Sequence, residues 1–221
     1  MKKIVWVFGE SATGKLTLIN NLCNNDKDTL DTFNMNNKKI CVSEITLEDR
    51  DHENYVDVKN IDDFDDTLLE NDSLYFNKQK ELKRRSCIMY DVDNFIKSDN
   101  DILLIKGQTN DMNIRRGNIV GNFLNKYYGL DNLKIEVFVL QVTDEHELKK
   151  RLETKTWFKE MDDLIEKERL IKTIPLKQQK HKEEVINSFD NYDIPIYQIE
   201  SLDGLYRLDG VINGKSSSTR R

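Results

Sequence analysis

Residues 2–23 read KKIVWVFGESATGKLTLINNLC, and this stretch decides the fold. The five β-branched or aromatic residues at 4–8 predict a short buried strand, which Gly9 ends. Residues 15–23 carry leucine and isoleucine at three-residue spacing, which predicts a helix. A strand, a glycine-bounded loop and a helix in this order are the context that a phosphate-binding loop requires.

The loop itself has a glycine, four residues, a second glycine and a lysine. Small residues let successive backbone N–H groups point at phosphate oxygens, while Lys15 reaches the terminal phosphates and the helix dipole favours an anion. The predicted nucleotide site consists of Gly9, Glu10, Ser11, Ala12, Thr13, Gly14, Lys15, Leu16 and Thr17, with Lys15 also catalytic. The alternative is a glycine-rich turn with an exposed lysine.

The loop departs from the usual pattern at one position. The residue after the lysine normally offers a hydroxyl to Mg²⁺, but here it is Leu16, and the hydroxyl comes one residue later at Thr17. Two interpretations follow. Either the metal is held by water, phosphate oxygens and a carboxylate elsewhere, or the chain binds nucleotide and turns it over poorly.

Composition favours one folded domain in the cytoplasm. The 221 residues are 33% charged and contain no apolar run long enough for a transmembrane helix or a signal peptide. Three widely spaced cysteines and three scattered histidines predict free thiols and no structural metal site. The net charge is −6, yet residues 44–72 alone hold twelve acidic and two basic residues. The rest of the chain is therefore mildly basic, which permits phosphate or polynucleotide binding.

The pattern along the chain alternates strands and helices, which predicts a parallel five-stranded sheet with helices on both faces. The expected strands are 2–8, 39–45, 101–105, 134–142 and 195–199, and the expected helices are 15–23, 76–97, 114–127, 145–153 and 175–189. The domain is expected to span 1–206, with an acidic variable lobe at 46–75, a lid-like segment at 153–173 and a flexible tail at 207–221. Ligands of such sheets bind at the carboxyl ends of the strands.

With this loop and layout, the chain resembles the P-loop kinases that phosphorylate nucleosides, nucleotides and nucleic-acid hydroxyls. Residues 139–152 look like the fourth strand and following helix of that family, in which an arginine before leucine lies over the adenine. The resemblance implies ATP and Mg²⁺ as cofactors and Arg151 as a catalytic and base-covering residue. It also implies a lid from which Lys155, Lys159 or Arg169 reaches the phosphates.

The residues that would bind and activate the phosphoryl acceptor are expected at the ends of the second and third strands. The resemblance implies a general base there, for which Glu44 and Asp49 are the candidates, with Asp51 nearby. The family keeps an acid near the end of the third strand, whereas this chain reads KGQTND at 106–111. Asp111 and Thr17 are the candidate metal ligands. The candidate acceptor-binding residues are Gln108, Asn110, Asp111 and Arg115.

The resulting functional hypothesis is an ATP-dependent phosphotransferase. Its acceptor is a nucleoside, a nucleotide or a modified base in DNA, as in the phage kinases that phosphorylate 5-hydroxymethyluracil in DNA. The alternative is a non-catalytic nucleotide-binding regulatory module, in which Leu16 marks a lost reaction. A GTPase is not expected, because no Asn-Lys-x-Asp guanine-reading motif follows a strand.

Overall fold

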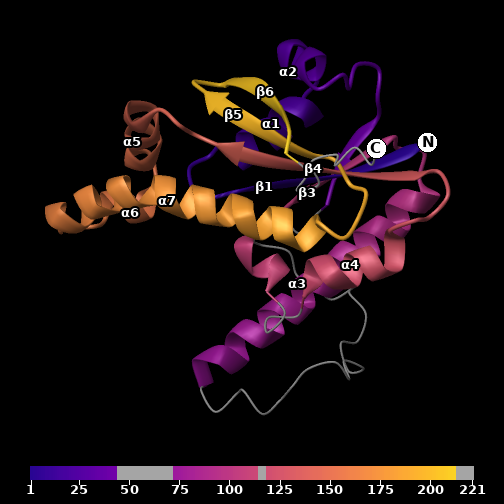
Figure 1. Cartoon of the computed structure of the whole chain (residues 1–221), viewed down its shortest axis with the longest axis horizontal. Coiled ribbons are helices and arrows are strands. Elements are labelled where there is room, and N and C mark those ends of the chain that lie inside the picture. Colours follow the sequence, from indigo (N-terminus) through magenta and orange to yellow (C-terminus); the bar gives the residue numbers. More distant parts are fainter. Residues whose placement is uncertain (44–71, 114–117, 213–221) are drawn as a thin grey trace, which may run out of the picture.

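A computed structural model describes residues 1–43, 72–113 and 118–212, which form a six-stranded sheet between two layers of helices (Figure 1). The strand order is β2-β3-β1-β4-β5-β6. The first five strands in this order are parallel and β6 is antiparallel to β5. The strands are β1 (Lys2–Gly9), β2 (Ile40–Val42), β3 (Ile102–Lys106), β4 (Leu133–Gln141), β5 (Ile196–Leu202) and β6 (Leu205–Val211). The chain therefore has an α/β fold with a mostly parallel sheet.

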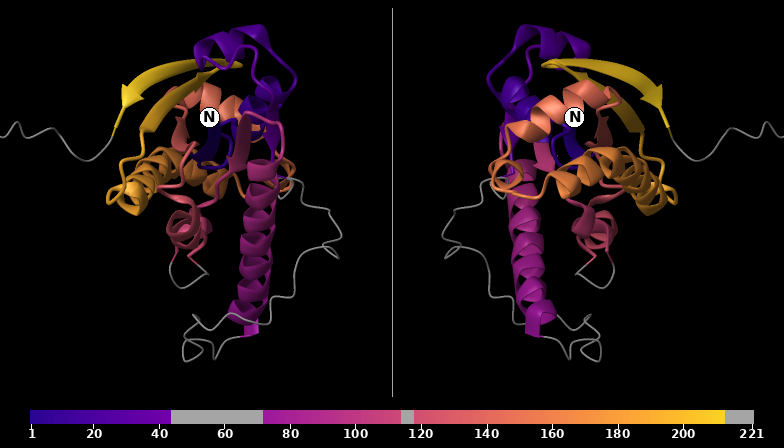
Figure 2. Two further views of the ribbon diagram at one scale, coloured as in Figure 1. Left: turned by 90° about the vertical axis from the view of Figure 1, so that its right-hand side faces the viewer. Right: turned by 90° about the vertical axis from the view of Figure 1, so that its left-hand side faces the viewer.

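Helices cover both faces of the sheet. They are α1 (Lys15–Cys23), α2 (Lys27–Thr32), α3 (Asp72–Lys97), α4 (Ile119–Tyr127), α5 (Glu145–Glu153), α6 (Thr156–Lys159) and α7 (Leu164–Phe189), with a short 3₁₀ helix η3 (Thr109–Met112). In Figure 1, α1 and α2 lie above the sheet and α3, α4 and α7 lie below it. Figure 2 shows that α3 extends well beyond the other helices of its layer.

The alternation of side chains along β1 divides the hydrophobic core into two parts. Ile4, Trp6 and Phe8 face α3, α4 and α7, whereas Val5 and Val7 face α1, and all five are fully buried. A strand buried on both faces is the expected consequence of a continuous apolar run. The central strand thus fixes where the loop at its carboxyl end emerges.

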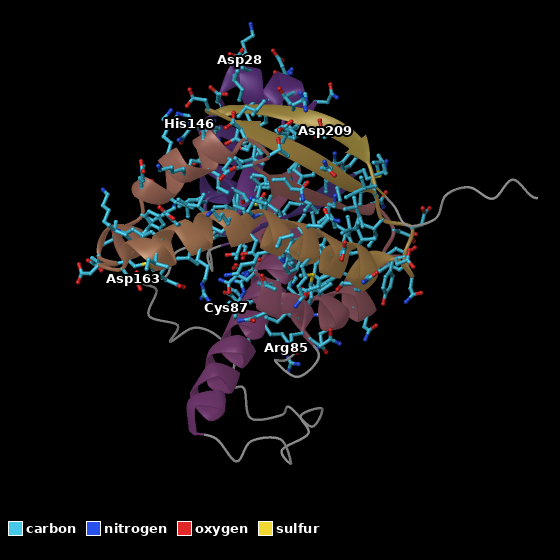
Figure 3. The ribbon with its side chains drawn as sticks, turned by 60° about the vertical axis from the view of Figure 1, so that its left-hand side comes forward. Asp28, Arg85, Cys87, His146, Asp163 and Asp209 are labelled. Carbon is cyan, nitrogen blue, oxygen red and sulfur yellow. The ribbon has the colours of Figure 1, made fainter. Side chains whose placement is uncertain are left out.

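Helix α7 is longer than expected from the sequence. Pro175 was expected to begin this helix, but α7 starts at Leu164 and continues through the proline. Proline removes a backbone hydrogen bond inside a helix at a cost of about 3 kcal/mol. Asp163 lies at the start of α7 (Figure 3), where its carboxylate accepts hydrogen bonds from the backbone N–H groups of residues 165 and 166. Ile174, next to the proline, is buried.

The C-terminal boundary also differs from the expectation. Residues 207–211 were assigned to a flexible tail, but they belong to β6, where Arg207 pairs with Asp209 at 2.8 Å and Asp209 lies along the strand (Figure 3). The helices α2 and α6 were not anticipated either. Most of the acidic lobe predicted at 46–75, and the tail from 213, lie outside the described residues. No helix in the described part of the chain is long and apolar enough to cross a membrane.

Candidate nucleotide site

The loop between β1 and α1, residues 9–17, is called the glycine loop below. Three of its residues have positive φ, which favours glycine: Gly9 has φ 147°, Ala12 has φ 67° and Gly14 has φ 91°. A Cβ at Gly9 would lie 2.6 Å from Thr13 Oγ1 and 2.8 Å from the Leu140 carbonyl oxygen. Because such contacts are shorter than van der Waals distance, this position accepts no side chain, and the loop can turn tightly against β4.

The glycine loop is closed by hydrogen bonds of its own. The buried Thr13 donates its hydroxyl to the Glu10 carbonyl at 2.9 Å, and its backbone N–H is 3.4 Å from the same oxygen. Helix α1 then begins at Lys15, with no side-chain cap on its first turn. The first N–H groups of a helix have no intrahelical acceptor, so this end of α1 is suited to an anion.

A cavity of about 360 Å³ lies over the glycine loop. It is lined by the loop, by the end of β3, by α5 and by the hairpin of β5 and β6. The lining residues are Glu10, Ser11, Ala12, Thr13, Gly14, Lys15, Leu16, Thr17, Lys106, Glu147, Arg151, Thr154, Lys155, Ser201, Gly204 and Tyr206. The sequence-predicted loop residues 10–17 and Arg151 are therefore brought together around one cavity, which Gly9 does not line.

Lys15 is held against the loop backbone. Its ammonium donates hydrogen bonds to the carbonyl oxygens of Gly9 and Glu10, the latter at 3.0 Å. Burial, followed by the charge of Lys106, lowers the pKa of Lys15 from 10.5 to about 8; Glu10 opposes this shift and Lys155 adds to it. The site is thus electropositive in the absence of any bound anion.

Arg151 braces the glycine loop from α5. Its Nε donates to Glu147 Oε1 at 2.6 Å, and Nη1 donates to the Thr13 carbonyl at 3.2 Å and to Ser201 Oγ at 2.9 Å. Nη2 donates to the Ser201 carbonyl at 3.2 Å. These contacts join α5, the glycine loop and β5, and Arg151 also lines the cavity.

Tyr206 of β6 also lines the cavity, although the sequence analysis did not select it. Asp203 and Gly204, both with positive φ, form the two-residue turn between β5 and β6, as expected of a type I′ hairpin. Burial raises the pKa of Tyr206 to about 12, although Arg151 opposes this shift. The Asp-Gly pair between two apolar segments was the sequence signal for this hairpin.

His181 on α7 is a second site residue that the sequence analysis missed. Its Nε2 accepts a hydrogen bond from the Gly9 backbone N–H at 3.2 Å, so the ring proton is on Nδ1, which donates to Thr109 Oγ1 at 3.2 Å. Burial, and then the charge of Lys15, lowers the pKa of His181 to about 4. This neutral imidazole fixes the start of the glycine loop to α7 and η3.

The residues predicted to hold the acceptor are dispersed. Asn110 lines a separate cavity of about 340 Å³ with Glu184, Asn187 and Ser188 of α7. Gln108 lies at the start of η3 and does not line the glycine-loop cavity. The candidate bases Glu44 and Asp49, together with Asp51 and Arg115, lie outside the described residues. Of the proposed lid cations, Lys155 lines the cavity, whereas Arg169 pairs with Glu166 at 2.8 Å on the surface.

Asp111, predicted as a metal ligand, is enclosed by other groups. Its Oδ1 accepts from Arg84 Nε at 2.7 Å, and its Oδ2 accepts from Arg84 Nη2 and from the Gln108 backbone N–H, both at 2.8 Å. The side chain is 0% exposed and does not line the glycine-loop cavity. Both oxygens are occupied by protein donors, so the geometry gives Asp111 a structural role at the end of β3.

The remaining donors around the cavity fit a Mg²⁺ ion poorly, because Mg²⁺ in kinase sites is held by one or two carboxylates together with waters and substrate phosphates. Leu16 occupies the usual hydroxyl position, and Lys106 stands at the end of β3. Of the two lining carboxylates, Glu147 is paired with Arg151. Within the described ranges, no group of three or more His, Cys, Asp or Glu side chains could hold a metal ion. The side-chain oxygens of Glu10, Ser11 and Thr17 also line the cavity, and a single carboxylate is among them.

Comparison with known proteins does not identify a family. No family model matches the chain, and no curated protein matches it. A solved structure described as "Structure of YGR205w protein" aligns over 96% of this chain and 89% of the other, with 11% sequence identity and a TM-score of 0.40. This TM-score is too low to carry an argument, so the geometry of the cavity has to bear the functional conclusion.

Proposed function

We propose that this chain is a phosphotransferase with a P-loop kinase type of site, which binds ATP through its phosphates and transfers the terminal phosphoryl group to a hydroxyl. The observation that carries the proposal is the glycine loop, which joins a buried strand to an uncapped helix N-terminus beneath a cavity containing Lys15. Backbone N–H groups of residues 14–17 and the ammonium of Lys15 are suited to the oxygens of the terminal phosphates.

The wall of the same cavity that faces away from the sheet end of β1 is not needed for phosphate and is suited to a nucleobase. Arg151 offers a planar guanidinium next to the glycine loop, Tyr206 offers an aromatic ring, and both line the cavity. Bases stack on such groups with little dependence on their hydrogen-bonding pattern. Ser201 and Gly204 also line this cavity.

Phosphoryl transfer asks the protein mainly to position the reactants and to neutralise charge. In this proposal, Lys15 neutralises charge on the transferring group, and Lys155 at the cavity rim approaches from the lid-like segment. Glu44 or Asp49 takes the proton of the acceptor hydroxyl, and Arg115 contacts the acceptor. Gln108 and Asn110, which do not line this cavity, are given no part in this step. The acceptor is a nucleoside, a nucleotide or a hydroxymethylated base in DNA. No step is assigned to Mg²⁺.

One observation favours a second function, that of a nucleotide-binding module without catalysis. Leu16, at the position of the usual metal-binding hydroxyl, is 45% exposed beside the cavity. The oxygen atoms of the residues that line the cavity do not form a complete set of metal ligands. A loop of this kind would still bind nucleotide phosphates. The difference between the two functions is therefore turnover and not affinity.

The test is ADP release from ATP, with nucleosides, nucleoside monophosphates, plain DNA and hydroxymethyluracil-containing DNA supplied separately, in magnesium and in EDTA. The kinase is supported if one acceptor stimulates ADP release, and that acceptor is then identified as the substrate. Lys15→Ala should abolish the stimulated release, whereas the distant surface variant Lys134→Ala should retain it. A DNA acceptor predicts that the rate falls steeply with salt. Tight ATP binding without stimulated release in any mixture would support the binding module instead.

A further inference from the structure

The end of β3 places a lysine on the same side of the sheet as the glycine loop. Lys106 is the last residue of β3 and lies opposite Val7 of β1 in the parallel register. Side chains alternate along a strand, and Leu104, two residues earlier, belongs to the core that faces α1. Lys106 therefore points toward α1 and not toward α7, and it lines the cavity over the loop.

Lys106 and Lys15 form a pair of like charges in this cavity. After burial, the charge of Lys106 is the largest cause of the lowered pKa of Lys15, which means that the two ammonium groups interact across the site. Neither forms an ion pair within 4.0 Å with a carboxylate of the described residues. Like charges that are held together oppose folding, the charge of Glu10 offsets only part of this cost, and a bound anion would remove the rest.

The cavity as a whole carries an excess of positive charge. Among the residues that the structure describes, Lys15, Lys106, Arg151 and Lys155 line it with two acids, Glu10 and Glu147. A free polyphosphate carries two more negative charges than its Mg²⁺ complex. The excess positive charge of the lining therefore complements the charge of a polyphosphate without Mg²⁺. In addition, Lys106 stands at the end of β3, where the resembled family keeps an acid for the metal.

We infer that the glycine-loop cavity binds its polyphosphate without a divalent cation, and that the ammonium of Lys106 supplies the charge that a metal would otherwise supply. This inference rests on the proposed nucleotide site. It follows from the disagreement between that site and a metal: Leu16 offers no oxygen, Asp111 is enclosed by Arg84, and a cation occupies the end of β3.

The inference predicts a reversed response to magnesium. Because Mg²⁺ reduces the negative charge of the ligand and is itself repelled by Lys106, affinity in EDTA should equal or exceed affinity in excess Mg²⁺. Lys106→Met removes one charged hydrogen-bond donor to phosphate, so it should weaken binding in EDTA by about tenfold or more. Lys134→Met is the matched control, since Lys134 is exposed near the opposite, amino-terminal end of β4.

The experiment is calorimetric titration of the full chain with ATP and, separately, with inorganic tripolyphosphate, each in EDTA and in excess MgCl₂. Equal or tighter binding in EDTA, with a loss of about tenfold in Lys106→Met and none in Lys134→Met, supports the inference. If binding requires Mg²⁺, or if Lys106→Met and Lys134→Met bind equally well, the inference is overturned. The proposed function is not affected by either result. If neither probe binds in either buffer, the proposed nucleotide site itself is refuted. The wild-type comparison needs no variant, so a misfolded Lys106→Met protein does not prevent the test.

Discussion

Replacing Lys15 by methionine should change how the stability of the ligand-free protein depends on pH. In the folded protein, burial and neighbouring cations lower the pKa of Lys15 from 10.5 to about 8. A difference of one pKa unit corresponds to about 1.4 kcal/mol, so the charged lysine destabilises the empty loop by about 3 kcal/mol. Hydrogen bonds from the ammonium to the Gly9 and Glu10 carbonyls offset part of this cost.

The direction of the pH effect follows from proton binding. Below pH 8 the folded and unfolded states both hold the Lys15 proton, and the free energy of unfolding carries the full penalty. Between pH 8 and 10.5 the unfolded chain holds more protons than the folded protein, so the stability of the wild type rises with pH. Between pH 7 and about pH 9.5, the wild type should therefore gain about 2 kcal/mol relative to Lys15→Met.

Urea unfolding of both proteins at pH 7, 8 and 9.5 measures this difference, because every other titrating group is common to the two chains. Lys134→Met provides the control for loss of a lysine far from the loop. A free-energy difference between wild type and Lys15→Met that stays constant from pH 7 to 9.5 would refute the reasoning. It would mean that Lys15 is hydrated and holds its proton throughout.

Three further changes test other parts of the site. His181→Phe should lower the free energy of unfolding by about 2–4 kcal/mol, because the Gly9 N–H and a hydroxyl lose their partner. The wild type should lose stability as the pH falls from 6.5 toward 4, since His181 binds a proton more readily in the unfolded chain, and the variant should lack this loss. Urea unfolding at both pH values measures the two effects. Tyr206→Ala should weaken ATP binding by about tenfold while Tyr206→Phe does not, since the ring and not the hydroxyl stacks on the base; equal affinities would remove Tyr206 from the site. Arg84→Met should cost about 3–5 kcal/mol by leaving the Asp111 carboxylate buried and unpaired, and combining it with Asp111→Leu should recover most of that loss in urea unfolding; additive losses would contradict the pairing.

The parts of the site that depend on consecutive residues were predictable from the sequence. The apolar run of β1, the two glycines and Lys15 lie within a few residues of one another, and their spacing alone places the loop at the end of a strand. Helix α5 has the bounds that were expected, with Asp144 as its N-cap. In these segments local preference and tertiary packing agree, which is why pattern analysis succeeds.

The contacts that complete the site join residues far apart in the chain. His181 is 172 positions from Gly9, and Arg151 is 138 positions from Thr13. No periodicity indicates such a pairing, because it depends on how α7 and α5 cross the sheet ends. The start of α7 was predicted wrongly because of a local signal. Pro175 indicated the first residue of the helix, but the helix of the folded protein continues through the proline.

The arrangement of charge suggests why the loop is braced so heavily by neutral contacts. Two lysines share the cavity, and their repulsion opposes the closed conformation of the empty loop. His181 holds Gly9 without adding charge, since its lowered pKa keeps the ring neutral. Arg151 holds Thr13 with its own charge balanced by Glu147. If the proposed function is right, this brace holds the loop in the shape that binds phosphate, and the repulsion between the two lysines, which Glu10 only partly offsets, is relieved by the polyphosphate. Preorganisation and affinity would then come from different residues.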